Sequence, residues 1–402
     1  MHFPFGKMVI KMSDLKIVFL TGTRADYGKL KPLMLACEKD KHIDLSVYVT
    51  GMHLFEKYGS TYHDIVSDGY SDIHIAEDYV MTENMDIDLA NTIIGFSKYI
   101  KKIKPDMIVV HGDRIEPLAG AIVGVLNNIK VVHIEGGEVT GTADEFMRHA
   151  ISKLSSMHFV SNDEAKFRLI QLGERESSIV VFGSPDIDIM LSDNLPDLND
   201  VKKMYNIYHD KYAIFSYHPV TTSDNLEFEI NQVIEALKKS DKNYIVIYPN
   251  NDTGSEIICK ALDSLGDDRR FICYKSIPFE NFIVLLKNAD FIIGNSSAGV
   301  REACVYGVPA IDIGKRQNGR YNLKIMRNIQ YADECCPEIL KCISNVDNHR
   351  FISYYYGNGH SAEIFLKTIK SRNFRKMDIQ KTFVDSSETH KAIINYINEV
   401  SF

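Results

Sequence analysis

The stretch Lys16-Ile-Val-Phe-Leu-Thr-Gly-Thr-Arg-Ala-Asp-Tyr-Gly28 decides the fold of this chain. Lys16 to Leu20 form an apolar run of strand length, and Thr21 to Gly28 supply a glycine-containing turn that leads into residues with helical spacing. A buried strand, a tight turn and a helix in this order form the repeating unit of a parallel sheet. We therefore expect an α/β protein.

The same unit recurs along the chain. In the first half, further strands are predicted at Leu45–Val49, Met107–Val110, Lys130–Ile134, His158–Val160 and Ile179–Phe182. In the second half, strands are predicted at Tyr212–Phe215, Tyr244–Ile247, Phe271–Tyr274, Phe291–Ile293 and Ala310–Ile313. The two halves share this pattern without detectable sequence repetition, so we expect two doubly wound parallel sheets.

The length of 402 residues also favours two domains. The segment Asp186–Asp200 is rich in Asp, Pro and Leu and shows no alternation, so we expect the chain to cross between domains there. The predicted domains cover 15–185 and 201–375. A terminal helix is predicted over 387–402, because apolar residues follow Ser-Ser-Glu at helical spacing.

Charge and composition exclude several classes of function. The formal net charge of -8, with no cluster of Lys and Arg among aromatic residues, excludes a nucleic-acid partner. The seven cysteines include no CxxC pair, which is typical of a reducing compartment. The sequence shows neither a signal peptide nor an apolar run long enough to span a membrane. We expect a cytoplasmic protein.

Polar residues collect where the predicted strands end. In the first half these ends are Thr21–Gly28, His111–Arg114 and Glu135–Glu138. In the second half they are Ser216–Pro219, Pro249–Gly254 and Gly294–Gly299. Ligands of open parallel sheets bind at the carboxyl ends of the strands, where helix N-termini present free N–H groups. We expect a ligand in a cleft between the two domains.

The turn Gly294-Asn-Ser-Ser-Ala-Gly299 suits a phosphate or a ribose, because small residues let backbone N–H groups approach an anion. The alternative is an ordinary strand-to-helix turn that begins with an N-capping serine. The stretch Gly22-Thr23-Arg24 matches neither a dinucleotide fingerprint nor a P-loop, which argues against an oxidoreductase or a kinase. Arg24 could bind a pyrophosphate; the alternative is a surface ion pair with Asp26.

Carboxylates gather at neighbouring strand ends. Asp113 and Glu135 follow adjacent predicted strands, and Asp144 begins the next helix. Paired carboxylates in a closed site can hold different protonation states, which suits acid/base chemistry. His111, His133 and Glu135 could instead be metal ligands, although a histidine inside a β-branched run is more often a core residue.

His218 differs from the other histidines because it lies beyond a strand end, just before Pro219. Its imidazole is therefore expected to face the cleft. The alternative is a structural histidine that bonds a carbonyl group.

Taken together, these motifs resemble the UDP-N-acetylglucosamine 2-epimerases, and most closely the hydrolysing bacterial branch that makes N-acetylmannosamine for sialic acid. The resemblance covers about Leu15 to Gly319. The motifs that carry it are Gly-Thr-Arg-Ala-Asp-Tyr-Gly, His-Gly-Asp-Arg, His-Ile-Glu-Gly-Gly-Glu, Ser-Pro-Asp, His-Pro-Val-Thr, Pro-Asn-Asn-Asp-Thr-Gly and Gly-Asn-Ser-Ser-Ala-Gly-Val-Arg-Glu. The non-hydrolysing branch usually has Gly-Thr-Arg-Pro-Glu near Arg24 and Gly-Asp-Thr at Asp113, and this chain departs from both.

The resemblance implies a GT-B-like fold of two Rossmann-like domains, with the last helix returning to the first domain and with no metal and no nicotinamide cofactor. Asp113, Glu135, Asp144 and His218 match the family's catalytic residues. The positions that match those holding the UDP portion are Arg24, Arg114, Asn250, Phe279, Ser296, Ser297, Glu302 and Arg316. We expect a homo-oligomer, either a dimer or a tetramer.

The implied reaction removes UDP from UDP-N-acetylglucosamine and releases N-acetylmannosamine. Three alternatives stay open. A GT-B glycosyltransferase would share the fold and pass the sugar to an acceptor, whereas a nucleotide-sugar sensor would bind without releasing UDP. A close relative of the family acts on a 2,4-diacetamido-6-deoxy sugar in legionaminic acid synthesis, so the sugar itself is undecided.

Overall fold

The structure is a computed structural model, and it describes residues 15–82, 84–139, 144–220, 225–249, 254–385, 387–389, 391 and 393–394. Its internal contacts divide the chain into two compact units. Of the described residues, the first unit contains 15–138, 144–182 and those from Ala362 onward. The second contains Val139 and 183–361.

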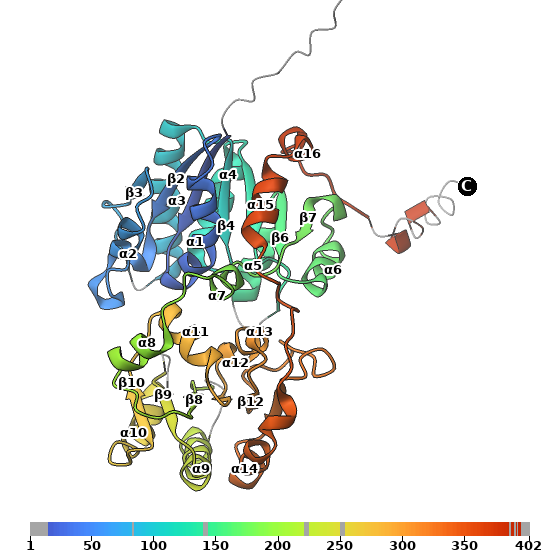
Figure 1. Cartoon of the computed structure of the whole chain (residues 1–402). Helices are drawn as coiled ribbons and strands as arrows, with labels where there is room; N and C mark the ends of the chain where they lie inside the picture. The colour runs from blue at the N-terminus through green and yellow to red at the C-terminus, as the bar shows by residue number, and fades with distance from the viewer. Residues whose placement is uncertain are drawn as a thin grey trace, which may run out of the picture. The chain divides into compact units, whose positions relative to one another are not determined.

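The first unit is built on a seven-stranded parallel sheet in the order β3-β2-β1-β4-β5-β6-β7 (Figure 1). Central strands that are buried on both faces read as continuous apolar runs, which explains Val18-Phe19-Leu20 and Ile108-Val109-Val110. The strands are β1 (Leu15–Thr21), β2 (Ile43–Val49), β3 (Ile73–Ile75), β4 (Met107–His111), β5 (Lys130–Ile134), β6 (Met157–Val160) and β7 (Ile179–Val181).

Helices cover both faces of this sheet. One face packs against α1 (Arg24–Glu38), α2 (Tyr62–Ser67), α15 (Ser361–Ile369) and α16 (Arg372–Lys376). The other face packs against α3 (Met85–Ile103), α4 (Ile115–Leu126) and α5 (Asp144–Leu154). α6 (Asp163–Gln171) closes a small cluster beside β6 and β7. Short 3-10 turns lie at Gly51–Leu54 (η1), Glu56–Tyr58 (η2) and Glu176–Ser178 (η3).

The second unit repeats the plan with six parallel strands in the order β10-β9-β8-β11-β12-β13. They are β8 (Ala213–Ser216), β9 (Tyr244–Ile247), β10 (Phe271–Tyr274), β11 (Ile292–Gly294), β12 (Ala310–Ile313) and β13 (Ile329–Ala332). α9 (Leu226–Lys239), α10 (Ser255–Asp263) and α14 (Cys336–Ser344) cover one face. The other is covered by α7 (Asp186–Met190), α8 (Leu198–Met204), α11 (Phe279–Lys287), α12 (Ser297–Arg301) and α13 (Ala303–Tyr306). A 3-10 turn, η4, spans Val346–His349.

The predicted parallel α/β architecture is therefore confirmed, and each strand predicted from the sequence is present within one or two residues of its predicted bounds. Two strands were not predicted, namely β3 and β13. Both lie at sheet edges and are three or four residues long, so neither needs the long apolar run that marks a central strand.

The boundaries between the units differ from the predicted ones. The segment Asp186–Asp200 is not a crossing, because it begins with α7, and Ile187 and Met190 of that helix are buried in the core of the second unit. The division falls instead at Phe182 and Gly183. The chain rejoins the first unit at Ala362, whereas the predicted second domain runs to residue 375.

The rejoining segment is held by aromatic packing. Phe365 lies 5.0 Å from Phe159 and 6.1 Å from Phe19, measured between ring centroids, and Phe374 of α16 is buried in the same core. Much of the predicted terminal helix over 387–402 lies outside the described residues. Among the helices that the structure describes, none is both apolar and long enough to cross a membrane.

Candidate functional site

Each sheet has one point where the strand order reverses, and ligands of such sheets bind there. In the first unit this point lies between β1 and β4, and in the second it lies between β8 and β11. Arg24 begins the helix that follows β1, and the loops that leave β4, β8 and β11 contain Asp113, His218 and Ser296. The topology therefore brings predicted site residues to the favoured position in both sheets.

The turn after β1 is fixed by Asp26. Thr23 is the N-cap of α1, and a capping box joins it to Asp26. The Asp26 carboxylate also accepts a hydrogen bond from the backbone N–H of Gly22 at 3.0 Å, and His53 lies 3.9 Å away. Burial alone would raise the pKa of Asp26, but His53 and these hydrogen bonds outweigh burial and lower it.

Arg24 is exposed at the start of α1. The alternative interpretation of Arg24, a surface ion pair with Asp26, is wrong, because Asp26 is buried and its carboxylate serves the turn itself. The cap therefore presents the Arg24 side chain outward from the carboxyl end of β1.

Glu116 lies beneath the turns that follow β1 and β2. A Cβ atom built on Gly22 would lie 2.5 Å from Cγ of Glu116, and one built on Gly51 would lie 2.5 Å from its Oε1. A side chain at either position would therefore press on Glu116, and Gly51 also has a φ of 60°, which favours glycine. Burial raises the pKa of the Glu116 carboxyl.

Asp113 follows β4 and is held by a buried arginine of α5. Nη2 of Arg148 donates to Oδ2 of Asp113, and Nη1 donates to the backbone carbonyl of Glu138 at 3.0 Å. The Asp113 side chain remains 28% exposed, whereas that of Arg148 is 4% exposed. The nearly buried guanidinium therefore fixes the direction of the Asp113 carboxylate.

Glu135 follows β5 and has a different set of neighbours. Its φ is 61°, a left-handed conformation that is unusual for a side chain other than glycine. The carboxylate lies 3.7 Å from Nζ of Lys29 and 3.2 Å from Nε2 of His111. The strand alternation therefore stops at Glu135, whose side chain meets residues of α1 and of β4.

His133 is a core residue and not a metal ligand. Both of its ring nitrogens are engaged, one with Oγ of Ser152 at 3.0 Å and the other with the carbonyl of Gly112 at 2.8 Å. Burial lowers its pKa to about 3. Among the described residues no group of three or more His, Cys, Asp or Glu side chains could hold a metal ion.

The other predicted residues of the first unit are more exposed. Asp144 is the exposed first residue of α5, one turn before Arg148. Arg114 is about half exposed, with Nε 3.8 Å from Oε2 of Glu116. Helix α5 thus carries Asp144 itself and, through Arg148, holds Asp113. Glu135 lies instead beside Lys29 and His111.

In the second unit, His218 is fixed by Asn295 across the ends of β8 and β11. The N–H of His218 donates to the Asn295 side chain at 2.7 Å, and the amide of Asn295 donates back to the His218 carbonyl at 2.8 Å. Nε2 of the imidazole lies 3.5 Å from Oγ of Ser216. Asn295 therefore fixes the backbone of His218, and the imidazole of His218 lies beside Ser216 at the end of β8.

The turn after β11 is also organised by Asn295. Nη1 of Arg316 and Nε2 of Gln317 donate to the Asn295 carbonyl at 3.1 and 2.8 Å. Ser296 is the N-cap of α12 and accepts from the N–H of Ala298 at 3.4 Å, as the structural interpretation predicted. Ser297 is the first residue of that helix.

Three further predicted residues complete the second unit. Glu302 is the C-cap of α12, and Phe279 begins α11, where its partly buried ring packs against the core. Asn250 lies outside the described residues. Near Arg316, burial raises the pKa of Asp312 to about 6, although Tyr321 donates to this carboxylate at 2.7 Å.

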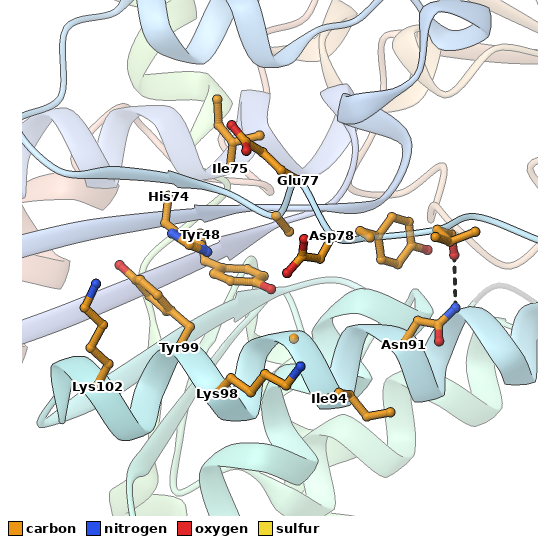
Figure 2. A pocket seen from close by; sticks show the side chains of 14 residues that line it. Tyr48, His74, Ile75, Glu77, Asp78, Asn91, Ile94, Lys98, Tyr99 and Lys102 are labelled. Atoms are coloured by element: carbon orange, nitrogen blue, oxygen red, sulfur yellow. Dashed lines mark hydrogen bonds between the residues drawn. The ribbon is translucent and has the colours of Figure 1, made fainter.

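A separate cavity of about 430 Å³ lies in the first unit between α3 and the segment that follows β3 (Figure 2). The ring of His74 is stacked 4.4 Å from Tyr99 and 5.2 Å from Tyr48. Lys98 and Lys102 extend toward this cavity from α3 (Figure 2). The residues predicted to bind or react with the substrate do not line it.

Sequence reasoning did not single out several residues that organise the site. They are Lys29, His53, Glu116, Arg148, Asn295 and Gln317. Arg148 carried a usable signal, since it lies four residues after Asp144 on the same helical face. Asn295 lies within the predicted turn Gly294–Gly299 but was not chosen as a site residue. For the others the contacts are long range, and no local pattern indicates them.

Comparison with known proteins agrees with this architecture. Residues 35–370 match the protein family described as UDP-N-acetylglucosamine 2-epimerase. The UDP-N-acetylglucosamine 2-epimerase of Neisseria meningitidis serogroup B is 42% identical over 373 residues, which cover 92% of this chain and 99% of that protein. The hydrolysing UDP-N,N'-diacetylbacillosamine 2-epimerase of Legionella pneumophila is 34% identical over 372 residues, which cover 89% and 96%.

Among solved structures, the Methanocaldococcus jannaschii UDP-GlcNAc 2-epimerase in complex with UDP-GlcNAc and UDP has a TM-score of 0.72 at 24% identity. The match covers 88% of this chain and 99% of that one. Two parallel sheets with polar loops at their reversal points define an α/β protein of the GT-B-like class. Within that class, the chain belongs to the UDP-N-acetylglucosamine 2-epimerase family.

Proposed function

We propose that this chain is a hydrolysing UDP-N-acetylglucosamine 2-epimerase, which converts UDP-N-acetylglucosamine and water into N-acetylmannosamine and UDP for sialic acid biosynthesis. The observation that carries the proposal is the 42% identity to the Neisseria enzyme over almost the full length of both chains. The 34% identity to a relative named as hydrolysing supports the loss of UDP.

The proposed reaction has two stages. A base removes the proton at C2 while the bond from C1 to oxygen breaks, so that UDP leaves and a 2-acetamidoglucal remains. Water then adds at C1, and a proton returns to C2 from the opposite face. These stages require a base, an acid and a stabilised leaving group.

The first unit would supply the acid/base groups. We assign Asp113 and Glu135 to removal and return of the C2 proton and Asp144 to activation of water. Asp113 is held by the Arg148 guanidinium, whereas Glu135 lies between Lys29 and His111. Carboxylates in different environments can hold different protonation states at one pH, as this division of roles requires.

The second unit would supply most of the nucleotide contacts. We assign His218 to assistance of phosphate departure and Arg316 to the charge that develops on UDP, with Arg24 contributing from the first unit. The other proposed UDP contacts are Arg114, Asn250, Phe279, Ser296, Ser297 and Glu302.

The decisive test is incubation of the purified protein with UDP-N-acetylglucosamine alone in heavy water, followed by proton NMR. We expect UDP and free N-acetylmannosamine to appear together, with deuterium at C2. A requirement for an acceptor would instead identify a glycosyltransferase, and binding without turnover would identify a sensor.

Two variants separate the assigned roles. Asp113→Asn should abolish turnover while UDP still binds, because the carboxylate acts on C2 and not on the nucleotide. Arg316→Ala should weaken UDP binding first. Isothermal titration calorimetry with UDP measures both, and an equal loss of UDP affinity in the two variants would contradict the assignment.

A second candidate substrate is UDP-N,N'-diacetylbacillosamine, a 2,4-diacetamido-6-deoxy sugar nucleotide, because the Legionella relative is named for it. The ratio of kcat/KM for the two sugar nucleotides decides between the substrates. We expect the ratio to favour UDP-N-acetylglucosamine.

A further inference from the structure

The segment that follows α16 holds the C-terminal end of α5 through one lysine. Nζ of Lys381 donates to the backbone carbonyls of Ser152, Lys153 and Ser155, at 3.2, 3.0 and 2.8 Å. The last carbonyls of a helix have no partner within the helix, and a cation at this end also meets the negative pole of the helix dipole. Lys381 is therefore a C-terminal cap that arrives from more than 200 residues away in the sequence.

A buried carboxylate fixes this lysine in place. Oε2 of Glu174 lies 2.5 Å from Nζ of Lys381 and 3.0 Å from Nε2 of His158, and Oε1 lies 2.8 Å from Nζ of Lys153. The Glu174 side chain is 1% exposed. Such a carboxylate strongly favours a nearby ammonium group, so Lys381 has little freedom to leave α5.

The capped helix carries groups assigned to the reaction. α5 begins at Asp144, and its buried Arg148 holds Asp113. Ser152, whose carbonyl accepts from Lys381, also bonds His133 of β5 through its hydroxyl. A shift of α5 along its axis would move Arg148, and the Asp113 carboxylate with it.

We propose that Lys381 is a positioning residue for the reaction, because its cap fixes the axial position of α5 and hence the place of Asp113 and Asp144. This inference rests on the proposed function for the roles of these two carboxylates. In the proposed reaction, Lys381 acts through α5 and does not itself contact the substrate.

The chain offers a matched control in Lys130. Nζ of Lys130 donates to the carbonyls of Phe374 and Arg375 at 3.2 and 2.9 Å, at the end of α16. Both lysines thus join the returning C-terminal segment to the rest of the first unit by capping a helix. Only Lys381 caps the helix that carries Arg148.

The experiment compares Lys381→Met with Lys130→Met in the full chain, with UDP-N-acetylglucosamine as substrate. For Lys381→Met we expect kcat to fall roughly tenfold with KM within about twofold, since small misplacements of catalytic groups reduce the rate strongly. Lys130→Met should keep kcat within about twofold of wild type. Lys381→Arg should restore most of the rate, because arginine keeps the charge and the donors.

Equal kcat values for the two methionine variants would overturn the inference. If Lys381→Met does not fold, Lys381→Gln replaces it, and a kcat equal to that of wild type overturns the inference. Amide hydrogen exchange over residues 144–154 gives a readout that does not depend on activity. In Lys381→Met, but not in Lys130→Met, exchange should accelerate along the whole of α5, from the capped C-terminal end to the first turn. Acceleration confined to the last turn would refute the inference, whereas absence of UDP release by the wild type would refute only the proposed function.

Discussion

Replacing Glu174 with glutamine should destabilise the first unit more than most single substitutions. Its carboxylate is almost fully buried and is surrounded by His158, Lys153 and Lys381. Burial alone would raise the pKa of Glu174, but hydrogen bonds and charges from these three residues outweigh burial and lower the pKa to about 2. The charged form of Glu174 is therefore strongly favoured in the folded protein.

The size of the effect follows from this pKa. The pKa of Glu174 falls from its ordinary value of 4.5 to about 2 in the folded protein. This difference corresponds to about 3 kcal/mol of folding free energy at neutral pH. Because the pKa is lowered in the folded state, this contribution is present above pH 4.5 and is lost as the pH falls toward 2. At pH 3.5 it should be smaller by about 1 kcal/mol.

Urea unfolding followed by far-UV circular dichroism measures the difference between wild type and Glu174→Gln at pH 7 and at pH 3.5. The matched control is Glu176→Gln, because Glu176 is 70% exposed and its ion pair with Lys166 lies at the surface, so its loss should change stability little. A difference below about 1 kcal/mol for Glu174→Gln at pH 7, or one that stays constant down to pH 3.5, would refute the reasoning.

Three further predictions concern the strand-end region. Gly22→Ala places a Cβ atom 2.5 Å from Cγ of Glu116 and should lower the free energy of unfolding by about 1 to 3 kcal/mol, measured by thermal unfolding. Adding Glu116→Ala to this variant should restore part of the lost stability. Burial raises the pKa of the Glu116 carboxyl in the folded protein, so wild-type stability should fall as the pH rises above the unfolded-state pKa. The variant Glu116→Gln does not titrate. Its stability relative to wild type, measured by urea unfolding, should therefore increase from about pH 4 to pH 7. His133→Phe removes the hydrogen bonds to Ser152 and Gly112 and should lower the free energy of unfolding in urea by about 2 kcal/mol. Because both ring nitrogens of His133 are engaged, added zinc should leave the melting temperature of the wild type unchanged.

The local pattern of the sequence was sufficient for the class of fold. A central strand such as Lys16–Leu20 must be apolar on both faces, so it leaves a visible run, and the glycines and polar residues after it mark where the strand ends. The edge strands β3 and β13 are short and leave no such run. The left-handed φ of Glu135 was not predicted either, since this conformation is unusual for a residue other than glycine.

By itself, then, the sequence determined the parallel architecture and the strand ends at which Asp113, Glu135 and His218 stand, since both depend on short-range periodicity. Only the tertiary structure decided their partners. Arg148 meets Asp113 across 35 residues, Lys29 meets Glu135 from another strand's helix, and Lys381 reaches α5 from the far end of the chain. Such pairs are selected by packing and by the burial of charge, which act through space and leave no periodic trace along the chain.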